Sequence, residues 1–369
     1  MTRAARPFTK NERAAFSLRP LNLAEPVVLT KLFLHIGQPK TATTTIQSFL
    51  SHNRGALINK GWLYPKTACQ YHAHHILGGM FNMNPADWLG RADPQETRDK
   101  LLAEIDSTGC HSVVMSSESL FFSKRGKVIR EFFEGFDLHI VAFLRRQDEW
   151  LESAYQEQRK NGATNQSPAE YLARQDMTLS YADRLATWVR RSGSQSVMVH
   201  AFERTAKPQP VEDIFLDMIG APQDAGYYRP PHQNERLNRD CVAYLSAMTE
   251  KRRLGLRFKR IKDILSDYSR LHPDNSDQRH IWPPAERIAL VERYSDQNRR
   301  VASEFLNRSN GELFSNPLPS ESEPWREYPG LKVETAVHIG EYLANRLFQQ
   351  AGPATNAAEP DSEAGSAQA

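Results

Sequence analysis

The sequence predicts an α/β protein with a mostly parallel central sheet flanked by helices, and three apolar runs predict its first strands. These runs are residues 32–36, 112–115 and 138–144. The last is apolar on both faces, as buried parallel strands are. Amphipathic helical patterns occur between the runs, for example at 96–107. The chain has 369 residues and is 40% apolar, which is enough for a sizeable core.

The remaining elements follow in order, and both ends of the chain differ from the middle. Residues 1–27 are polar and basic, and we expect a flexible arm there. Residues 28–350 are expected to form one main domain, with a helical portion from about residue 237. Residues 351–369 contain no aromatic side chain and predict a disordered tail. The pattern also predicts a strand at 196–201 and helices at 44–60, 168–174, 181–191, 211–219, 284–306 and 333–348.

Charge and cysteine content narrow the classes of function. The formal net charge is +3, so the chain carries no general signature of nucleic-acid binding. The three cysteines, Cys69, Cys110 and Cys241, are far apart, which indicates a reducing compartment and not a disulfide framework. The first 30 residues lack an apolar run typical of a signal peptide, and no stretch of 18 apolar residues occurs. These features predict a cytoplasmic protein.

Residues 32–47 combine a strand, a tight turn and a helix start, an arrangement that binds anions. The free N–H groups of the helix start point at the ligand, and the helix dipole favours negative charge. Lys40 adds a positive charge, and hydroxyl donors come from Thr41, Thr43, Thr44 and Thr45. In the Walker A pattern G-x-x-x-x-G-K-[ST] counted from Gly37, the lysine position is Thr43, so the lysine is displaced. We predict a cradle for a phosphate-like group; a plain strand-to-helix turn with a threonine cap is the alternative.

The loop Pro39-Lys40-Thr41-Ala42-Thr43-Thr44 resembles the P-K-x-G-T-T loop of sulfotransferases. In that family the loop binds the 5′-phosphosulfate end of PAPS (3′-phosphoadenosine 5′-phosphosulfate). The resemblance implies that PAPS would be contacted here by Lys40, Thr41, Ala42, Thr43, Thr44 and Thr45. The family's glycine is Ala42 in this chain, and its methyl group can hold the backbone slightly further from the ligand.

Arg145 and Ser153 match the second signature of the same family. Arg145 stands at the end of the strand at 138–144, and Ser153 follows eight residues later on a predicted helix. In the family, an arginine and a serine with this separation hold the 3′-phosphate of PAPS. A guanidinium group offers a bidentate fork to a phosphate, and serine adds a neutral donor. A surface ion pair of Arg145 with a neighbouring acid is the alternative.

Glu118 is the first candidate for the catalytic base. The strand at 112–115 runs into Ser116-Ser117-Glu118, and ligands gather at the carboxyl ends of parallel strands. Many cytosolic sulfotransferases end the matching strand in Lys-Thr-His, with the histidine as base, and Glu118 falls at that place. The resemblance therefore implies that Glu118 removes the acceptor proton. Capping of the following turn is the alternative.

His72 is the second candidate for the base, because a histidine often follows the Y-P segment in bacterial sulfotransferases. It lies in Cys69-Gln70-Tyr71-His72-Ala73-His74-His75, where one thiol and three imidazoles suggest zinc. A second ligand pair at a metal-binding spacing is missing, so no metal is predicted. Asn234 and Arg236 are weaker candidates for closing over the nucleotide. Residues 251–262 carry seven basic and no acidic side chains, which fits contact with an anionic membrane or polyanion, or simply a solvated helix face.

Together, the two signatures imply a P-loop NTPase-like sulfotransferase fold. The implied reaction moves a sulfuryl group from PAPS to a hydroxyl or amine, without a metal. The acceptor is expected to be a carbohydrate or a lipid-linked sugar of a bacterium. A P-loop kinase using ATP and Mg²⁺ is the first alternative, disfavoured by the displaced Lys40 and by the missing Walker B aspartate. A non-catalytic nucleotide- or glycan-binding protein on the same fold is the second, and Ala42 keeps it open. Nothing in the sequence indicates an oligomeric state.

Overall fold

The structure is a computed structural model, and its described residues fall into two compact units. It describes residues 29–82, 92–123, 125–174, 179–194, 196–203, 208–231, 237–248 and 256–351. Unit 1 comprises 1–155, 166–233 and 280–325, and unit 2 comprises 156–165, 234–279 and 326–369. The expected arm at 1–27 and the candidates Asn234 and Arg236 lie outside the described residues.

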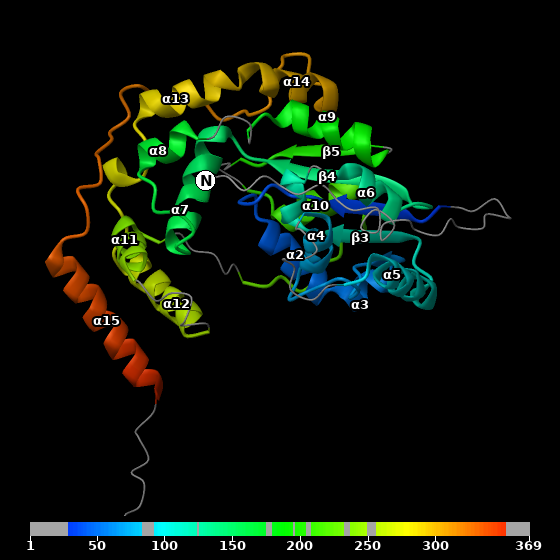
Figure 1. The fold of residues 1–369 in the computed structure, drawn as a ribbon, viewed down its shortest axis with the longest axis horizontal. Helices are drawn as coiled ribbons and strands as arrows, with labels where there is room; N and C mark the ends of the chain where they lie inside the picture. Colours follow the sequence, from blue (N-terminus) through cyan, green and yellow to red (C-terminus); the bar gives the residue numbers. More distant parts are fainter. Residues whose placement is uncertain are drawn as a thin grey trace, which may run out of the picture. The chain divides into compact units, whose positions relative to one another are not determined.

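A five-stranded, all-parallel sheet forms the centre of unit 1 (Figure 1). Its strands lie in the order β2-β3-β1-β4-β5. They are β1 (Lys31–His35), β2 (Trp62–Leu63), β3 (Ser112–Ser116), β4 (Asp137–Leu144) and β5 (Ser196–Ala201). The chain leaves β1 toward β2 and β3 on one side and later returns to its other side as β4. Such a switch point is where α/β sheets bind ligands, at the carboxyl ends of the strands. The predicted α/β class with a parallel sheet is confirmed.

Alternate side chains of each strand supply two cores on opposite faces of the sheet. On β1, Leu32 and Leu34 join the larger core, and Phe33 joins the smaller one. Helices α2 (Thr43–His52) and α10 (Val211–Ile219) pack in the smaller core. The helices of the larger core are α4 (His75–Asn82), α5 (Pro94–Thr108), α6 (Gly126–Phe132), α7 (Gln147–Lys160), α8 (Pro168–Ala173), α9 (Tyr181–Ser192), α13 (Pro284–Arg293) and α14 (Ser295–Leu306).

Two predicted long helices are each broken into two. The helix expected at 44–60 forms α2 and α3 (Arg54–Ile58), with the break at Asn53. The Asn53 side chain donates to the carbonyl of Tyr228 at 2.8 Å and accepts from its N–H at 2.9 Å. The helix expected at 284–306 breaks at Tyr294, where φ is −105°. Neither break involves proline or glycine, so the local sequence gives no signal for it.

Unit 2 consists of helices within the described residues. They are α11 (Arg239–Ala247), η3 (Ser276–Gln278), α12 (Leu256–Leu271) and α15 (Val333–Ala351). Leu245, Leu265 and Ile339 belong to the core that joins the three α-helices. Residues 251–255 of the basic stretch and 352–369 of the expected tail lie outside the described residues. Among the described helices, none is both long and apolar enough to cross a membrane.

Candidate functional site

Three residues in left-handed conformation shape the turn between β1 and α2. They are Gly37 (φ 58°), Lys40 (φ 74°) and Ala42 (φ 59°). Left-handed backbone costs a non-glycine residue on the order of 1–2 kcal/mol, and such strain concentrates at ligand sites. At Gly37 a Cβ atom would come within 2.8 Å of the Thr43 methyl group and 3.1 Å of Glu118 Cβ. Gly37 is therefore required both for its backbone conformation and for the close approach of Glu118.

The start of α2 is open to an anion. Ala42 is the N-cap residue and makes no side-chain capping bond, and the first turn contains no acidic residue. The Ala42 carbonyl accepts from the N–H groups of Thr45 at 3.0 Å and Ile46 at 3.2 Å. Within the described residues, the N–H groups of Thr43 and Thr44 have no backbone acceptor. A helix start with free amides and a nearby lysine is a phosphate-binding arrangement.

The threonines of the loop differ in what their hydroxyl groups can do. Thr41 is fully buried, and its hydroxyl donates to the Gln38 carbonyl at 2.6 Å. This hydrogen bond of the Thr41 hydroxyl therefore stabilises the turn. Thr43 is buried against Gly37, whereas Thr44 is exposed at the helix start. Thr44 has the most accessible hydroxyl of the three for a ligand.

The end of β4 holds the loop in place through a buried glutamine. Gln38 accepts from the Arg145 N–H at 2.9 Å and donates to the Tyr181 hydroxyl at 2.8 Å. Tyr181 in turn donates to the Arg145 carbonyl at 2.7 Å. Burial raises the pKa of Tyr181, so the hydroxyl keeps its proton. Sequence reasoning missed Gln38 and Tyr181, since their pairing joins residues 143 positions apart.

The two predicted signatures touch each other. Arg145 Nη1 donates to the Lys40 carbonyl at 3.4 Å across 105 residues of sequence. Trp150 Nε1, on the helix after Arg145, donates to the Pro39 carbonyl at 2.8 Å. The guanidinium group expected for the 3′-phosphate thus lies against the loop expected for the 5′-phosphosulfate.

Glu149 is an unexpected member of this part of the site. Arg145 Nε pairs with Glu149 Oε2 at 3.1 Å, with 14% and 21% of the two side chains exposed. Glu149 and Ser153 are four residues apart on α7 and therefore share a helix face. Ser153 is half-buried and makes no hydrogen bond with the rest of the described chain. The ion pair that the sequence left as an alternative therefore exists, and an incoming phosphate would share Arg145 with Glu149.

Glu118 begins the 3₁₀ helix η1 (Glu118–Phe122) directly after β3, beside Gly37 of the loop. Its carboxylate Oε2 accepts from Gln47 Nε2 at 2.6 Å. The same amide nitrogen lies 3.1 Å from Ser116 Oγ, which is 2.8 Å from His35 Nδ1. The structure therefore brings Glu118 to the loop and joins it to a buried polar chain that sequence reasoning missed.

Two buried histidines flank this chain and are neutral. Burial lowers the pKa of His35 and of His74 to about 3. The Ser116 N–H donates to His74 Nδ1 at 3.0 Å, so the His74 proton is on Nε2, 3.1 Å from the Pro65 carbonyl. Ser116 thus contacts one imidazole through its hydroxyl and the other through its backbone.

His72 is not brought to the loop. Its ring lies 5.0 Å from that of His52, the last residue of α2. Because α2 has 10 residues, its two ends are about 13 Å apart. The role of His72 as the base stays a prediction, and in this structure Glu118, not His72, lies beside the loop. Within the described residues, no three histidine, cysteine or acidic side chains come together in a way that could hold a metal ion.

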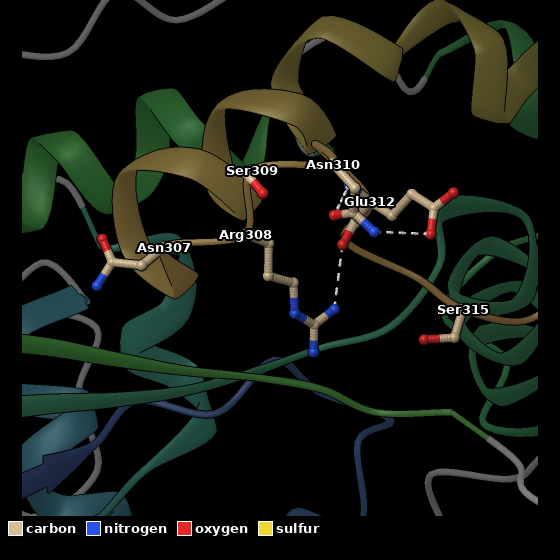
Figure 2. Close-up of a pocket in the computed structure, with 6 residues that line it drawn as sticks. All are labelled: Asn307, Arg308, Ser309, Asn310, Glu312 and Ser315. Atoms are coloured by element: carbon tan, nitrogen blue, oxygen red, sulfur yellow. Dashed lines mark hydrogen bonds between the residues drawn. The ribbon is translucent and has the colours of Figure 1, made fainter.

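A polar hollow follows α14 in unit 1 (Figure 2). It is lined by Asn307, Arg308, Ser309, Asn310, Glu312 and Ser315. Arg308 Nη1 donates to the carbonyls of Glu312 at 3.1 Å and Leu313 at 3.0 Å. None of the site residues predicted from sequence lines this hollow, so it is separate from the loop site.

Comparisons with known proteins give limited similarity. No protein-family model matches the chain. An uncharacterized protein of Archaeoglobus fulgidus is 24% identical over 187 residues, which cover 48% of each chain, so the chain spans about half the length of this curated relative. A sulfotransferase structure from Alicyclobacillus acidocaldarius is similar over 66% of this chain and 96% of its own, with 17% identity and a TM-score of 0.38.

Proposed function

We propose that this chain is a sulfotransferase that moves the sulfuryl group of PAPS to an acceptor hydroxyl or amine. One observation supports the proposal: the loop that leads into the open start of α2 contacts both an arginine and a glutamate. Arg145 Nη1 donates to the Lys40 carbonyl, and Glu118 lies close to Gly37. A donor with two separated anionic groups and an acceptor that must lose a proton need these three parts.

Each part has a distinct task in the proposed reaction. The amides of Thr43 and Thr44, with Lys40, stabilise the negative charge that develops on the bridging oxygen of the leaving phosphate. Glu118 takes the proton of the acceptor hydroxyl as the new O–S bond forms and the S–O bond to the phosphate breaks. The products are the sulfated acceptor, 3′-phosphoadenosine 5′-phosphate (PAP) and a proton, which Glu118 later releases to water.

Arg145 and Ser153 are proposed to hold the 3′-phosphate. Arg145 keeps donors for a phosphate. Its Nε donates to Glu149 and its Nη1 donates to the Lys40 carbonyl, whereas its Nη2 has no partner among the described residues. Ser153 lies on the same helix face and adds a hydroxyl. Ala42 is compatible with the loop, since it already adopts the left-handed conformation that glycine would take.

The acceptor is proposed to be a carbohydrate or lipid-linked sugar in a bacterial cytoplasm. This part rests on the resemblance of the two signatures and on three cysteines that are free of disulfides. Its test is the release of PAP from PAPS in the presence of candidate glycans, followed by mass analysis of the glycan. A gain of 80 mass units on the glycan would support the assignment.

The proposal is tested by calorimetric binding of PAP, 5′-AMP and ADP without Mg²⁺, using wild type and Arg145→Ala. We expect PAP to bind more tightly than AMP, and Arg145→Ala to lose about 1.5–3 kcal/mol toward PAP alone, a tenfold or larger weakening. Arg300→Ala is the matched control, because Arg300 also pairs with a glutamate four residues on, at 2.9 Å, on the exposed face of α14.

Other outcomes point to the two alternatives. Nucleotide binding that requires Mg²⁺ and prefers ADP would support the kinase. PAP binding without release of PAP from PAPS, across a broad set of acceptors, would support a non-catalytic binding protein. Equal affinities for PAP and AMP would overturn the role of Arg145.

A further inference from the structure

Gln47 lies on a helix face where the other buried side chains are mostly apolar. Ile46, Phe49 and Leu50 of α2 belong to the smaller core, and Gln47 beside them is 3% exposed. Burying an amide is costly unless its hydrogen bonds are made. The Gln47 amide makes them at the carboxyl ends of two strands, where the site is.

The orientation of this amide is fixed by chemistry. An ionised carboxylate only accepts hydrogen bonds, so the atom 2.6 Å from Glu118 Oε2 must be the amide nitrogen. Its second hydrogen points to Ser116 Oγ at 3.1 Å, and Ser116 Oγ lies 2.8 Å from His35 Nδ1. In this arrangement the buried Ser116–His35 pair fixes the orientation of the Gln47 amide, and the amide in turn fixes the orientation of the Glu118 carboxylate.

We propose that Gln47 is a positioning residue for the reaction: its buried amide holds the Glu118 carboxylate in one orientation beside the loop. This inference rests on the proposed function, in which Glu118 is the base. Within the described residues, Gln47 is the one side chain that donates to the Glu118 carboxylate. A hydrogen bond to a charged carboxylate is short and directional, so the amide fixes the orientation of the group that accepts the proton.

The other ionisable groups around Glu118 do not replace this contact. His35 from β1 and His74 before α4 are neutral, because burial lowers their pKa to about 3. Tyr64 after β2 is also neutral, because burial raises its pKa. Two arginines bond to the backbone of neighbouring segments: Arg184 of α9 donates to the Phe121 carbonyl of η1 at 3.2 Å, and Arg54 of α3 donates to the Tyr64 carbonyl at 2.9 Å.

The test compares wild type with Gln47→Met, which keeps the size of the side chain and removes both N–H donors. The rate of PAP release from PAPS measures turnover, calorimetry measures PAP affinity, and Glu118→Gln gives the rate without the base. We expect Gln47→Met to slow PAP release about tenfold, and to have no further effect in the Glu118→Gln background. Gln47→Asn, with a shorter reach, is expected to slow PAP release as well.

Gln95→Met is the matched control. Gln95 Nε2 also donates to a carboxylate, that of Asp99 at 2.8 Å, but in an exposed contact on α5. We expect it to leave PAP release and PAP binding unchanged. PAP affinity of Gln47→Met should also equal that of wild type, because the start of α2 is intact.

The outcomes separate this inference from the proposed function. Slower PAP release with unchanged PAP affinity supports the positioning role. An unchanged rate overturns it, as does an equal slowing in the Glu118→Gln background, since Gln47 would then act through the packing of α2 and not through Glu118. If wild type neither binds PAP nor releases it from PAPS, the proposed function itself fails.

Discussion

Replacing Glu149 with glutamine is predicted to strengthen PAP binding. Glu149 Oε2 lies 3.1 Å from Arg145 Nε. At that distance and an effective dielectric of about 20, the gross attraction is roughly 5 kcal/mol, of which partly exposed pairs keep about 1 kcal/mol. A 3′-phosphate on the same guanidinium would lie roughly 5 Å from the carboxylate, a gross repulsion of about 3 kcal/mol per phosphate charge.

After screening by solvent, we expect Glu149→Gln to tighten PAP binding by about 1 kcal/mol, roughly fivefold, and to leave AMP unchanged. Calorimetry at low and high salt measures it, and the gain should shrink as salt screens the repulsion. Glu304→Gln removes the carboxylate of a similar pair with Arg300 on α14 and should change neither ligand. Weaker PAP binding in Glu149→Gln would refute the reasoning, because Glu149 would then be needed to hold Arg145 in place.

Two further predictions concern stability. Ala42→Gly should raise the free energy of unfolding by roughly 1 kcal/mol, because Ala42 has a left-handed φ of 59°. Denaturant titration measures this gain. A loss of stability would mean that the left-handed backbone at Ala42 is not strained. His35 and His74, with folded pKa values of about 3 against 6.5 for an unfolded histidine, bind fewer protons in the folded state, so stability should fall as pH drops from about 6.5 toward 3. Each histidine changes the free energy of unfolding by at most about 1.4 kcal/mol per pH unit. His35→Phe keeps the ring contact with Phe143, and it should reduce the loss of stability between pH 7 and pH 5 that urea unfolding measures. An unchanged loss of stability would contradict the assignment.

Much of the site is visible in the sequence because its parts are local. The strand, turn and helix around Lys40 follow from a short apolar run, and the structure has β1 and α2 there. Glu118 was predicted at the end of a strand, and parallel strands bring their carboxyl ends to one edge. Arg145 was found in the same way, at the end of β4.

The sequence alone determined the α/β class, the strands and the positions of the loop, Glu118 and Arg145, because each depends on residues close together in the chain. The tertiary structure decided which distant side chains meet. Only the strand order puts β1 between β3 and β4, and with it Gln47 against Glu118 and Gln38 against Arg145. It also placed His72 at the far end of α2, since hydrogen bonds and ring contacts between residues far apart in sequence leave no periodic pattern to read.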